Sequence, residues 1–433
     1  MLTEKQQKAI ELFKLGKSFC LTGQAGTGKS HIIKEISSIC KEKDFIFAIT
    51  ALTGCAANLI KGQTVHRFFG VGTAESDTET LITKIRMKNP TARKRIQNTK
   101  ILVIDEISMM SGNLFDKLET ISRKIRKNDE FFGGIQIILS GDFCQLQPIG
   151  DDTFCFESKV WKKNIKDIIY LEEIIRQSDP IFQKLLTEIR LGILTEETKN
   201  ILSSRKIKNI KEAYISINNA NGTNDGISII PTILYPHKIN VENINNNELV
   251  KLKKTGNDCK TYIAVDNSIS LGKTKRATKE EVEMLDKYCN TPTIIELTIK
   301  SQVMLTVNLD VESGLVNGAR GVITSFKEEN PVIMFDNGLE CDIEKFKFEV
   351  DMSSKILTRN QIPLILAWAI TIHKSQGATL THVITDLNNV FCDGQSYVTL
   401  SRVKSLDGLF ITNIDFRKIT CNNRVKEFYK NLL

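Results

Sequence analysis

Ten residues near the N-terminus, LTGQAGTGKS at positions 21–30, constrain this chain more than any other stretch. They fit the pattern G-x-x-x-x-G-K-[ST], with Gly23, Gly28, Lys29 and Ser30 in register. In such loops the glycines let successive backbone N–H groups turn toward one phosphate, at a helix N-terminus that already favours anions. The pattern therefore predicts a loop that binds the phosphates of a nucleoside triphosphate.

The residues on either side of the loop fit this interpretation. Residues 18–22 form a short apolar run suited to a buried strand, and residues 31–40 have helical spacing. Lys29 would reach the β- and γ-phosphates, and the Ser30 hydroxyl would bind Mg²⁺. We therefore expect ATP and Mg²⁺ as ligands. The residues expected to hold the nucleotide are Gly23, Gly26, Thr27, Gly28, Lys29 and Ser30.

Composition excludes several classes of protein. A chain of 433 residues is long enough for two to four domains, and its net charge of +8 is compatible with a polyanionic partner. The ten cysteines form no C-x-x-C pair or zinc-like cluster, which favours a reducing, intracellular compartment. No apolar run approaches the roughly 18 residues of a membrane span. The N-terminus is not typical of a signal or transit peptide, so we expect no membrane partner and no targeting segment.

The order of apolar segments predicts an α/β protein. Residues 45–50, 101–106 and 135–142 are apolar on both faces, as in buried parallel strands, and a second strand–helix set begins near residue 167. Between residues 248 and 360, short strands alternate with Asn-Gly turns, which is typical of a small β-barrel. Residues 218–225 read as a loop, and residues 362–377 as one long buried strand that leads back into the second domain. The expected divisions are 1–165, 166–245, 246–360 (the inserted β-barrel) and 361–433.

Acidic and amide side chains follow two of the predicted strands. Asp105 can bind Mg²⁺, and Glu106 can polarise an attacking water. Gln145 follows the next strand, closely after Asp142, where an amide can detect the γ-phosphate. A solvated acidic turn and a capped turn are the structural alternatives for these two segments.

Two arginines far from the loop are candidates for an arginine finger, Arg402 and Arg176. A lone arginine is more often a surface residue, so this assignment depends on the neighbouring segments. Residues 373–379, HKSQGAT, supply donors suited to a phosphodiester backbone. The candidate DNA contacts there are His373, Lys374, Ser375 and Gln376.

Taken in order along the chain, these segments resemble the Pif-type family of DNA helicases, in the RecD-like branch of superfamily one. The matching segments are residues 2–9, 51–72, 113–148 and 307–323. The resemblance implies two RecA-like P-loop domains with a small inserted β-barrel, and a DNA-wedge insertion near residues 60–75. It also implies that Gln6 contacts adenine. The DNA contacts that it implies in the first domain are Thr53, Gly54, Thr64, His66 and Phe68.

The function implied is an ATP- and Mg²⁺-dependent helicase that moves on single-stranded DNA and unwinds forked DNA in replication, repair or recombination. The 5′-to-3′ direction is implied by the family alone, and we expect a monomer. In this mechanism Arg176 and Arg402 lie on the second wall of a cleft, opposite Lys29.

Several alternatives remain open. Phe68 is either a stacking platform for bases or a core aromatic. The basic stretch at residues 84–100, which has no acidic residue, either guides duplex DNA or is a solvated loop. The rival functions are a P-loop phosphotransferase, a DNA-binding module with a decayed ATPase, and a translocase that strips proteins from single strands with little unwinding.

Overall fold

The computed structural model of this chain describes residues 2–148, 150–177, 179–210, 212–213, 231–270, 272–289, 291–310, 312–352 and 355–432. These residues form two compact units. The first consists mainly of Met1–Ile193 and Thr420–Leu433, and the second mainly of Leu194–Asp351 and Lys355–Ile419. The loop predicted at residues 218–225 lies outside the described residues.

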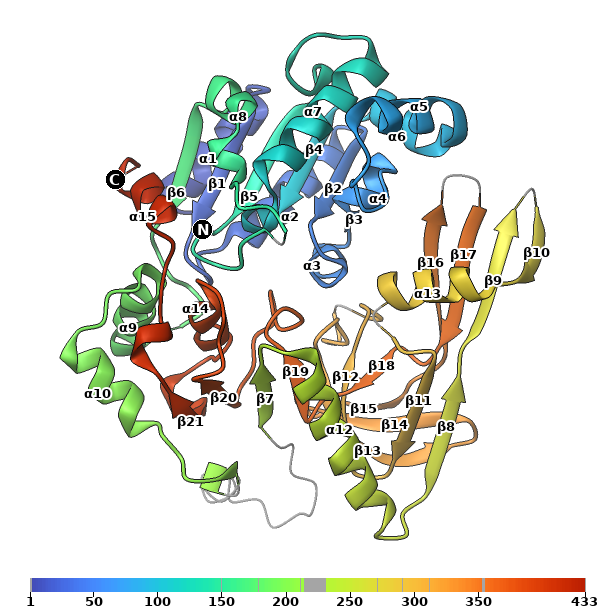
Figure 1. Ribbon diagram of the computed structural model, residues 1–433, viewed down its shortest axis with the longest axis vertical. Helices are drawn as coiled ribbons and strands as arrows, with labels where there is room; N and C mark the ends of the chain where they lie inside the picture. The colour runs from blue at the N-terminus through green and yellow to red at the C-terminus, as the bar shows by residue number, and fades with distance from the viewer. Residues whose placement is uncertain are drawn as a thin grey trace. The chain divides into compact units, whose positions relative to one another are not determined.

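The first unit is built on a six-stranded parallel sheet with the order β3-β2-β4-β5-β1-β6 (Figure 1). Its inner strands are apolar on both faces because helices pack on each side, as expected for a parallel sheet. The strands are β1 (Phe19–Gly23), β2 (Phe47–Ala51), β3 (Gln63–Thr64), β4 (Ile101–Asp105), β5 (Gln136–Gly141) and β6 (Asp167–Leu171).

Helices α1 and α2 cover one face of this sheet. Ile10 and Phe13 of α1 and Ile32 and Ile36 of α2 join Phe19 and other strand residues in one buried cluster. The helices of this unit are α1 (Glu4–Lys14), α2 (Lys29–Glu42), α3 (Gly54–Leu59), α4 (Val65–Phe69), α5 (Thr78–Lys88), α6 (Pro90–Asn98), α7 (Gly112–Arg126), α8 (Lys159–Asn164), α9 (Pro180–Leu191) and α15 (Asn423–Lys430).

The second unit contains a four-stranded parallel sheet with the order β19-β7-β20-β21. Its strands are β7 (Thr232–Tyr235), β19 (Ala369–Thr371), β20 (Val383–Leu387) and β21 (Leu409–Ile414). Its helices include α10 (Glu196–Ser204), α12 (Lys238–Lys253) and α14 (Gln395–Leu400). Since β7 and β19 are hydrogen-bonded neighbours, the long segment between them is an insertion into this sheet.

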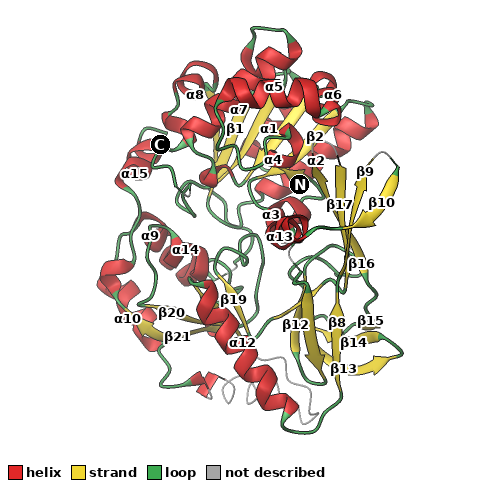
Figure 2. Cartoon of the chain, turned by 45° about the vertical axis from the view of Figure 1, so that its right-hand side comes forward, coloured by secondary structure: helices red, strands yellow, loops and turns green. Residues whose placement is uncertain are grey.

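The insertion is antiparallel where its registers are described. A five-stranded sheet, β15-β14-β13-β12-β18, shares one apolar core with the pair β11-β8 (Figure 2). These strands are β8 (Cys259–Ile263), β11 (Ile294–Thr298), β12 (Gln302–Leu305), β13 (Arg320–Lys327), β14 (Asn330–Phe335), β15 (Glu340–Asp342) and β18 (Leu364–Leu366). Two parallel sheets and an antiparallel insertion confirm the predicted fold class.

A further sheet in the insertion was not predicted. It has the order β10-β9-β17-β16, and helix α13 packs on it. The sequence around β10 reads as a charged stretch because all four residues of that strand are exposed, whereas β9 is mostly half-buried. The elements are β9 (Val265–Ser270), β10 (Lys273–Arg276), α13 (Lys279–Tyr288), β16 (Phe346–Met352) and β17 (Lys355–Gln361).

Two predictions about segments were wrong. Residues 167–171 form β6, which pairs with β1, so the first sheet extends past residue 165. Residues 362–377 form two short strands: β18 pairs antiparallel with β12 in the insertion, and β19 pairs parallel with β7. One apolar run serves two sheets because the chain passes from one core to the other within it.

The segment at residues 60–75, which the resemblance assigns to a DNA wedge, begins at the edge of the first sheet. β3 pairs in parallel with the last two residues of β2, and α4 follows it directly.

Candidate functional site

The glycine-rich loop joins β1 to α2 in the geometry that phosphate binding requires. Gly26 and Gly28 have φ angles of +85° and +86°, which side chains rarely adopt. Lys29 Nζ donates to the carbonyl oxygens of Gly23 and Gln24, both at 2.7 Å. The ammonium group is therefore held over the loop, where it would meet the phosphates.

Arg176 and Gln6 lie directly against this loop. A Cβ on Gly26 would lie 2.5 Å from the Cβ of Arg176, and a Cβ on Gly28 would lie 2.8 Å from Gln6 Nε2. The backbone N–H of Arg176 also donates to the Gly26 carbonyl. Arg176 thus belongs to the same unit as the loop, and its expected place on a second wall was wrong. The error follows from the domain boundary, because β6 carries this segment back to the first sheet.

Gln6 is buried, and helix α1 fixes its orientation. Its backbone N–H donates to Thr3 Oγ1, and its side-chain Oε1 accepts from the backbone N–H of Thr3, which forms a capping box. The Nε2 group is left pointing toward Gly28. This position fits a contact with the base of a bound nucleotide.

The acidic pair lies at the carboxyl end of β4, beside the loop. Asp105 is buried, and burial raises the pKa of its carboxyl group. Glu106 has a φ angle of +52°, an uncommon backbone conformation that clusters at functional sites. Burial lowers the pKa of Lys29, whereas the charges of Asp142, Glu106 and Asp105 oppose that shift. These carboxylates are close enough to the ammonium group to form one electrostatic centre with it.

Asp142 follows β5 and forms an ion pair that the sequence does not reveal. The Asp142 and Arg190 side chains are 0% and 2% exposed, and Arg190 Nη2 lies 2.9 Å from Asp142 Oδ1. Burial alone would raise the pKa of Asp142, but the charge and hydrogen bonds of Arg190 hold it below its usual value. Arg190 lies four residues after Leu186, on the apolar stripe of α9. An arginine at such a position is the one sequence feature that indicates a buried charge there.

Tyr429 of the C-terminal helix α15 completes this group. Its hydroxyl donates to Asp142 Oδ1 at 3.0 Å, accepts from the backbone N–H of Phe143 at 3.0 Å, and lies 2.7 Å from Thr22 Oγ1. Because the tyrosine proton goes to the carboxylate, the Thr22 hydroxyl is the donor in the last bond. One phenol therefore links β1, just before the phosphate-binding loop, to the segment after β5.

Gln145 lies within the same segment. Its backbone N–H donates to the Asp142 carbonyl, and its side chain is buried. Gln145 Oε1 has no hydrogen-bond partner among the described residues. A buried, unsatisfied amide oxygen is costly, which is consistent with a group that binds a ligand or a water molecule.

The DNA contacts expected in the first unit have structural roles of their own. Thr53 Oγ1 accepts from Ala56 N–H, and Thr64 Oγ1 accepts from Arg67 N–H at the start of α4. Gly54 begins α3, and His66 is half-buried in α4. Phe68 is 0% exposed, which corrects the prediction that it stacks on bases, because α4 turns this ring into the core.

In the second unit, the HKSQG segment forms the turn after β19. His373 is half-buried, which lowers its pKa, and Lys374 is exposed. Ser375 is buried and donates its hydroxyl proton to the Ile372 carbonyl, which fixes its side chain within the turn. Gln376 is also buried.

Arg402 lies just after α14 and is buried. Its Nε donates to the Val398 carbonyl at 2.9 Å, and its Nη2 donates to Ser401 Oγ at 2.8 Å. The guanidinium is thus held against its own turn, in a fixed orientation.

Two family profiles match this chain. The profile for PIF1-like helicases matches residues 1–200, and the profile for the 2B domain of DNA helicase Pif1 matches residues 284–326. The chain is 40% identical to the ATP-dependent DNA helicase PIF1 of Danio rerio over its whole length, and covers 64% of that protein. It is 34% identical to the ATP-dependent DNA helicase RRM3 of Saccharomyces cerevisiae, and covers 68% of it. The chain thus spans about two thirds of the length of these relatives.

Solved structures agree with the sequence matches. The Pif1 helicase of Candida albicans has a TM-score of 0.83 and 32% identity, with both chains fully covered. A Bacteroides Pif1 in complex with ADP-AlF4 has a TM-score of 0.77 and 27% identity, with 97% of that chain covered. The same protein has been solved bound to single-stranded DNA, with a TM-score of 0.70 and 26% identity over 97% of that chain.

Proposed function

This chain belongs to the PIF1-like helicase family, and from that premise we propose that it is an ATP-dependent DNA helicase. The observation that carries the proposal is the single group formed by Lys29, Asp105, Glu106 and Asp142 around the glycine-rich loop. Relatives covered by this chain are ATP-dependent DNA helicases, and a Bacteroides relative binds ADP-AlF4.

The nucleotide site fits ATP with Mg²⁺. Gly26 and Gly28 let Arg176 and Gln6 approach the loop at positions where a Cβ would collide with them, and Lys29 lies over the loop. Ser30 and Asp105 would hold the Mg²⁺ ion, which stabilises charge on the phosphates when bound. Among the described residues, no three His, Cys, Asp or Glu side chains form a metal site by themselves.

Within this site we assign three further roles. Glu106 polarises the attacking water, Gln145 detects the γ-phosphate, and Gln6 contacts adenine. Arg176 and Arg402 neutralise the charge that develops during phosphoryl transfer, in the manner of arginine fingers.

The proposed partner is DNA, both single-stranded and forked. A Bacteroides Pif1 has been solved with single-stranded DNA, and another Pif1 helicase structure concerns unwinding at forked double-stranded DNA. We assign contacts with DNA to Thr53, Gly54, Thr64, His66, His373, Lys374 and Gln376, and a 5′-to-3′ direction from the family. The chain is proposed to act as a monomer.

We also place the protein in a reducing, intracellular compartment. Every cysteine that the structure describes is a free thiol, including Cys144 and Cys421, whose sulfur atoms are 3.8 Å apart. No helix in the described ranges has the length and apolar character of a membrane span.

The deciding experiment measures ATP hydrolysis with and without single-stranded DNA. DNA should stimulate turnover, and Lys29→Ala and Arg402→Ala should each lower it by roughly 10³-fold, the scale of a lost arginine finger. Lys34→Ala, an exposed residue on the same helix α2 as Lys29, is the matched control and should retain activity. If single-stranded DNA does not change the rate of ATP hydrolysis, or if Lys29→Ala retains that rate, the proposal is overturned.

A translocase that remodels nucleoprotein with little unwinding is the second candidate. A translocase and a helicase would use the same residues of the ATP site. They would differ only in what ATP hydrolysis accomplishes, which is displacement of bound protein or separation of strands. Strand separation on a forked duplex, compared with displacement of streptavidin from a biotinylated single strand, distinguishes the two.

A further inference from the structure

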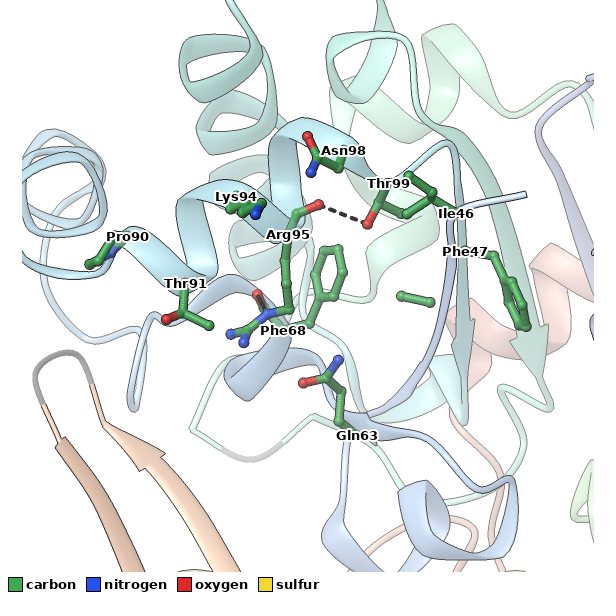
Figure 3. Close-up of a pocket in the computed structure, with 11 residues that line it drawn as sticks. Ile46, Phe47, Gln63, Phe68, Pro90, Thr91, Lys94, Arg95, Asn98 and Thr99 are labelled. Carbon is green, nitrogen blue, oxygen red and sulfur yellow. Dashed lines mark hydrogen bonds between the residues drawn. The ribbon is translucent and has the colours of Figure 1, made fainter. Parts of the chain in front are cut away.

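A cavity of about 530 Å³ lies in the first unit, at the β2–β3 edge of its sheet (Figure 3). Elements β2, β3, α4 and α6 form it, and it includes no residue of the ATP site. Its lining residues are Ile46, Phe47, Ala48, Gln63, Phe68, Pro90, Thr91, Lys94, Arg95, Asn98 and Thr99.

The cavity exists because β3 covers only part of β2. β3 pairs with β2 at Thr50 and Ala51, whereas β4 pairs with all five residues of β2 on the other side. The first three residues of β2 therefore have no neighbouring strand along one edge. The sheet edge ends in a hollow there.

The inner wall of the cavity is apolar. Phe47 and Ile49 pack into the core cluster that α1 and α2 cover. Because successive strand residues point to opposite faces, Ile46 and Ala48 face away from that cluster, toward α6. Ile46 is exposed and the small Ala48 is half-buried, so both can contact an occupant of the cavity.

The rim of the cavity is cationic. Figure 3 shows Arg95 of α6 next to Phe68, and Arg95 donates to the carbonyl oxygens of Arg67 and Phe68. Lys94 is exposed, and no carboxylate in the described part of the chain lies in ion-pair contact with it. None of the lining residues is acidic, and residues 84–100 contain lysines and arginines but no acidic residue.

We propose that this cavity is a docking site for an acidic peptide that carries one aromatic or large aliphatic side chain. The apolar side chain would occupy the hollow beside Ile46 and Ala48, and the flanking carboxylates would pair with Lys94 and Arg95 on its rim. The positive charge of this rim selects an acidic partner, and the apolar wall selects a peptide anchor over a phosphate backbone.

This proposal also gives the basic stretch a role. The structure places that stretch on two helices, α5 and α6, whose apolar residues Ile82, Ile85 and Ile96 are buried. The cations therefore lie on the outer side of a packed helical pair, as a surface for a partner.

The test is fluorescence anisotropy with a labelled peptide in which one phenylalanine is flanked on each side by a run of aspartates. Lys94→Glu should weaken binding by about tenfold, equivalent to about 1.4 kcal/mol. Ala48→Leu, which fills the cavity without changing charge, should weaken it to a similar degree. Lys88→Glu makes the same charge change at an exposed residue on α5 outside the cavity, and should change the Kd by less than about twofold.

Further measurements make each outcome decisive. Replacing the phenylalanine of the peptide by alanine should abolish binding, and ATP hydrolysis and thermal unfolding should be unchanged in the Ala48 and Lys94 variants. If Lys94→Glu and Lys88→Glu weaken binding equally while Ala48→Leu does not, the interaction is a general surface attraction and the docking site is disproved. If Ala48→Leu instead weakens binding of an oligothymidine, the occupant is a nucleobase and the peptide proposal is wrong.

Discussion

Two buried arginines, Arg190 in the first unit and Arg359 in the insertion, show how similar ion pairs acquire different roles. Each is at most 2% exposed and binds an aspartate through Nε and Nη2. Arg190 binds Asp142, and Arg359 binds Asp266 with additional bonds to Asp286 and Thr293. In both places a fork of fixed geometry replaces the lost hydration of a carboxylate.

The surroundings of the two pairs differ. Asp142 follows a parallel strand beside the glycine-rich loop, and its charge acts on Lys29. Asp266 lies on β9, in an antiparallel sheet of the second unit. Ligands of α/β proteins bind at the carboxyl ends of the parallel strands, where loops converge, and only the Asp142–Arg190 pair lies at such a place.

The largest effect should follow Arg190→Ala, which leaves Asp142 buried without a partner. Removing one member of a buried pair typically costs about 3–5 kcal/mol. We also expect ATP turnover per folded molecule to fall at least about tenfold, the scale of a lost supporting contact at a reactive centre. Urea unfolding and ATPase assays at one temperature measure both effects. A destabilised variant with full turnover would remove this pair from the mechanism.

Arg359→Ala should lower stability without lowering ATP turnover, in contrast to Arg190→Ala. The free energy of unfolding should fall by about 3 kcal/mol, at the lower end of the range because Asp286 is half-exposed. Turnover per folded molecule should stay within about twofold, since no nucleotide-site residue touches Arg359 in the described structure. The same pair of assays checks this. If Arg359→Ala lowered turnover as much as Arg190→Ala, the proposed difference between the two ion pairs would be wrong.

A smaller effect should follow Tyr429→Phe. The Phe143 N–H loses its acceptor and Asp142 loses a donor, which should cost about 1–3 kcal/mol. Turnover should fall less than in Arg190→Ala, because the ion pair remains. The matched control is Tyr262→Phe in the insertion, where the buried hydroxyl has no partner among the described residues and its loss should cost nothing. Equal losses of stability in both variants would contradict the role of the Tyr429 network.

The smallest effect should appear in the dependence of stability on pH. The folded-state pKa of Asp142 lies below its unfolded value, so its contribution is present above about pH 4 and is lost as the pH falls through the folded pKa. Asp142→Asn should therefore flatten the acid side of the curve of unfolding free energy against pH. Asp286→Asn, at a half-exposed carboxylate of the other pair, should flatten it less. If the unfolding free energy of the wild type and of Asp142→Asn changed with pH at the same slope, the lowered folded-state pKa of Asp142 would be refuted.

Local sequence predicted the parts of the site that depend on neighbouring residues. The loop at residues 21–30 and the acidic pair after β4 were read correctly as segments beside strand ends, because strand, turn and helix there are consecutive in the chain. The antiparallel insertion was also predicted, since its Asn-Gly turns are local signals.

The errors came from segments whose neighbours are distant in sequence. β6 looks like the start of a new domain, yet it pairs with β1, and this pairing carries Arg176 to the loop. Phe68 matches a motif for contact with DNA, but α4 places its ring in the core. No local pattern shows with which strand a short apolar segment will pair, or on which face its side chains will be buried.

By itself, the sequence determined the glycine-rich loop, the acidic pair, the α/β class and the family, because each is encoded in contiguous residues. Only the tertiary structure decided that Arg190 and Tyr429 belong beside that loop, and that Arg176 shares its unit. The physical reason is that a buried charge is stable only where a partner reaches it, and here the partners of Asp142 lie 48 and 287 residues away along the chain.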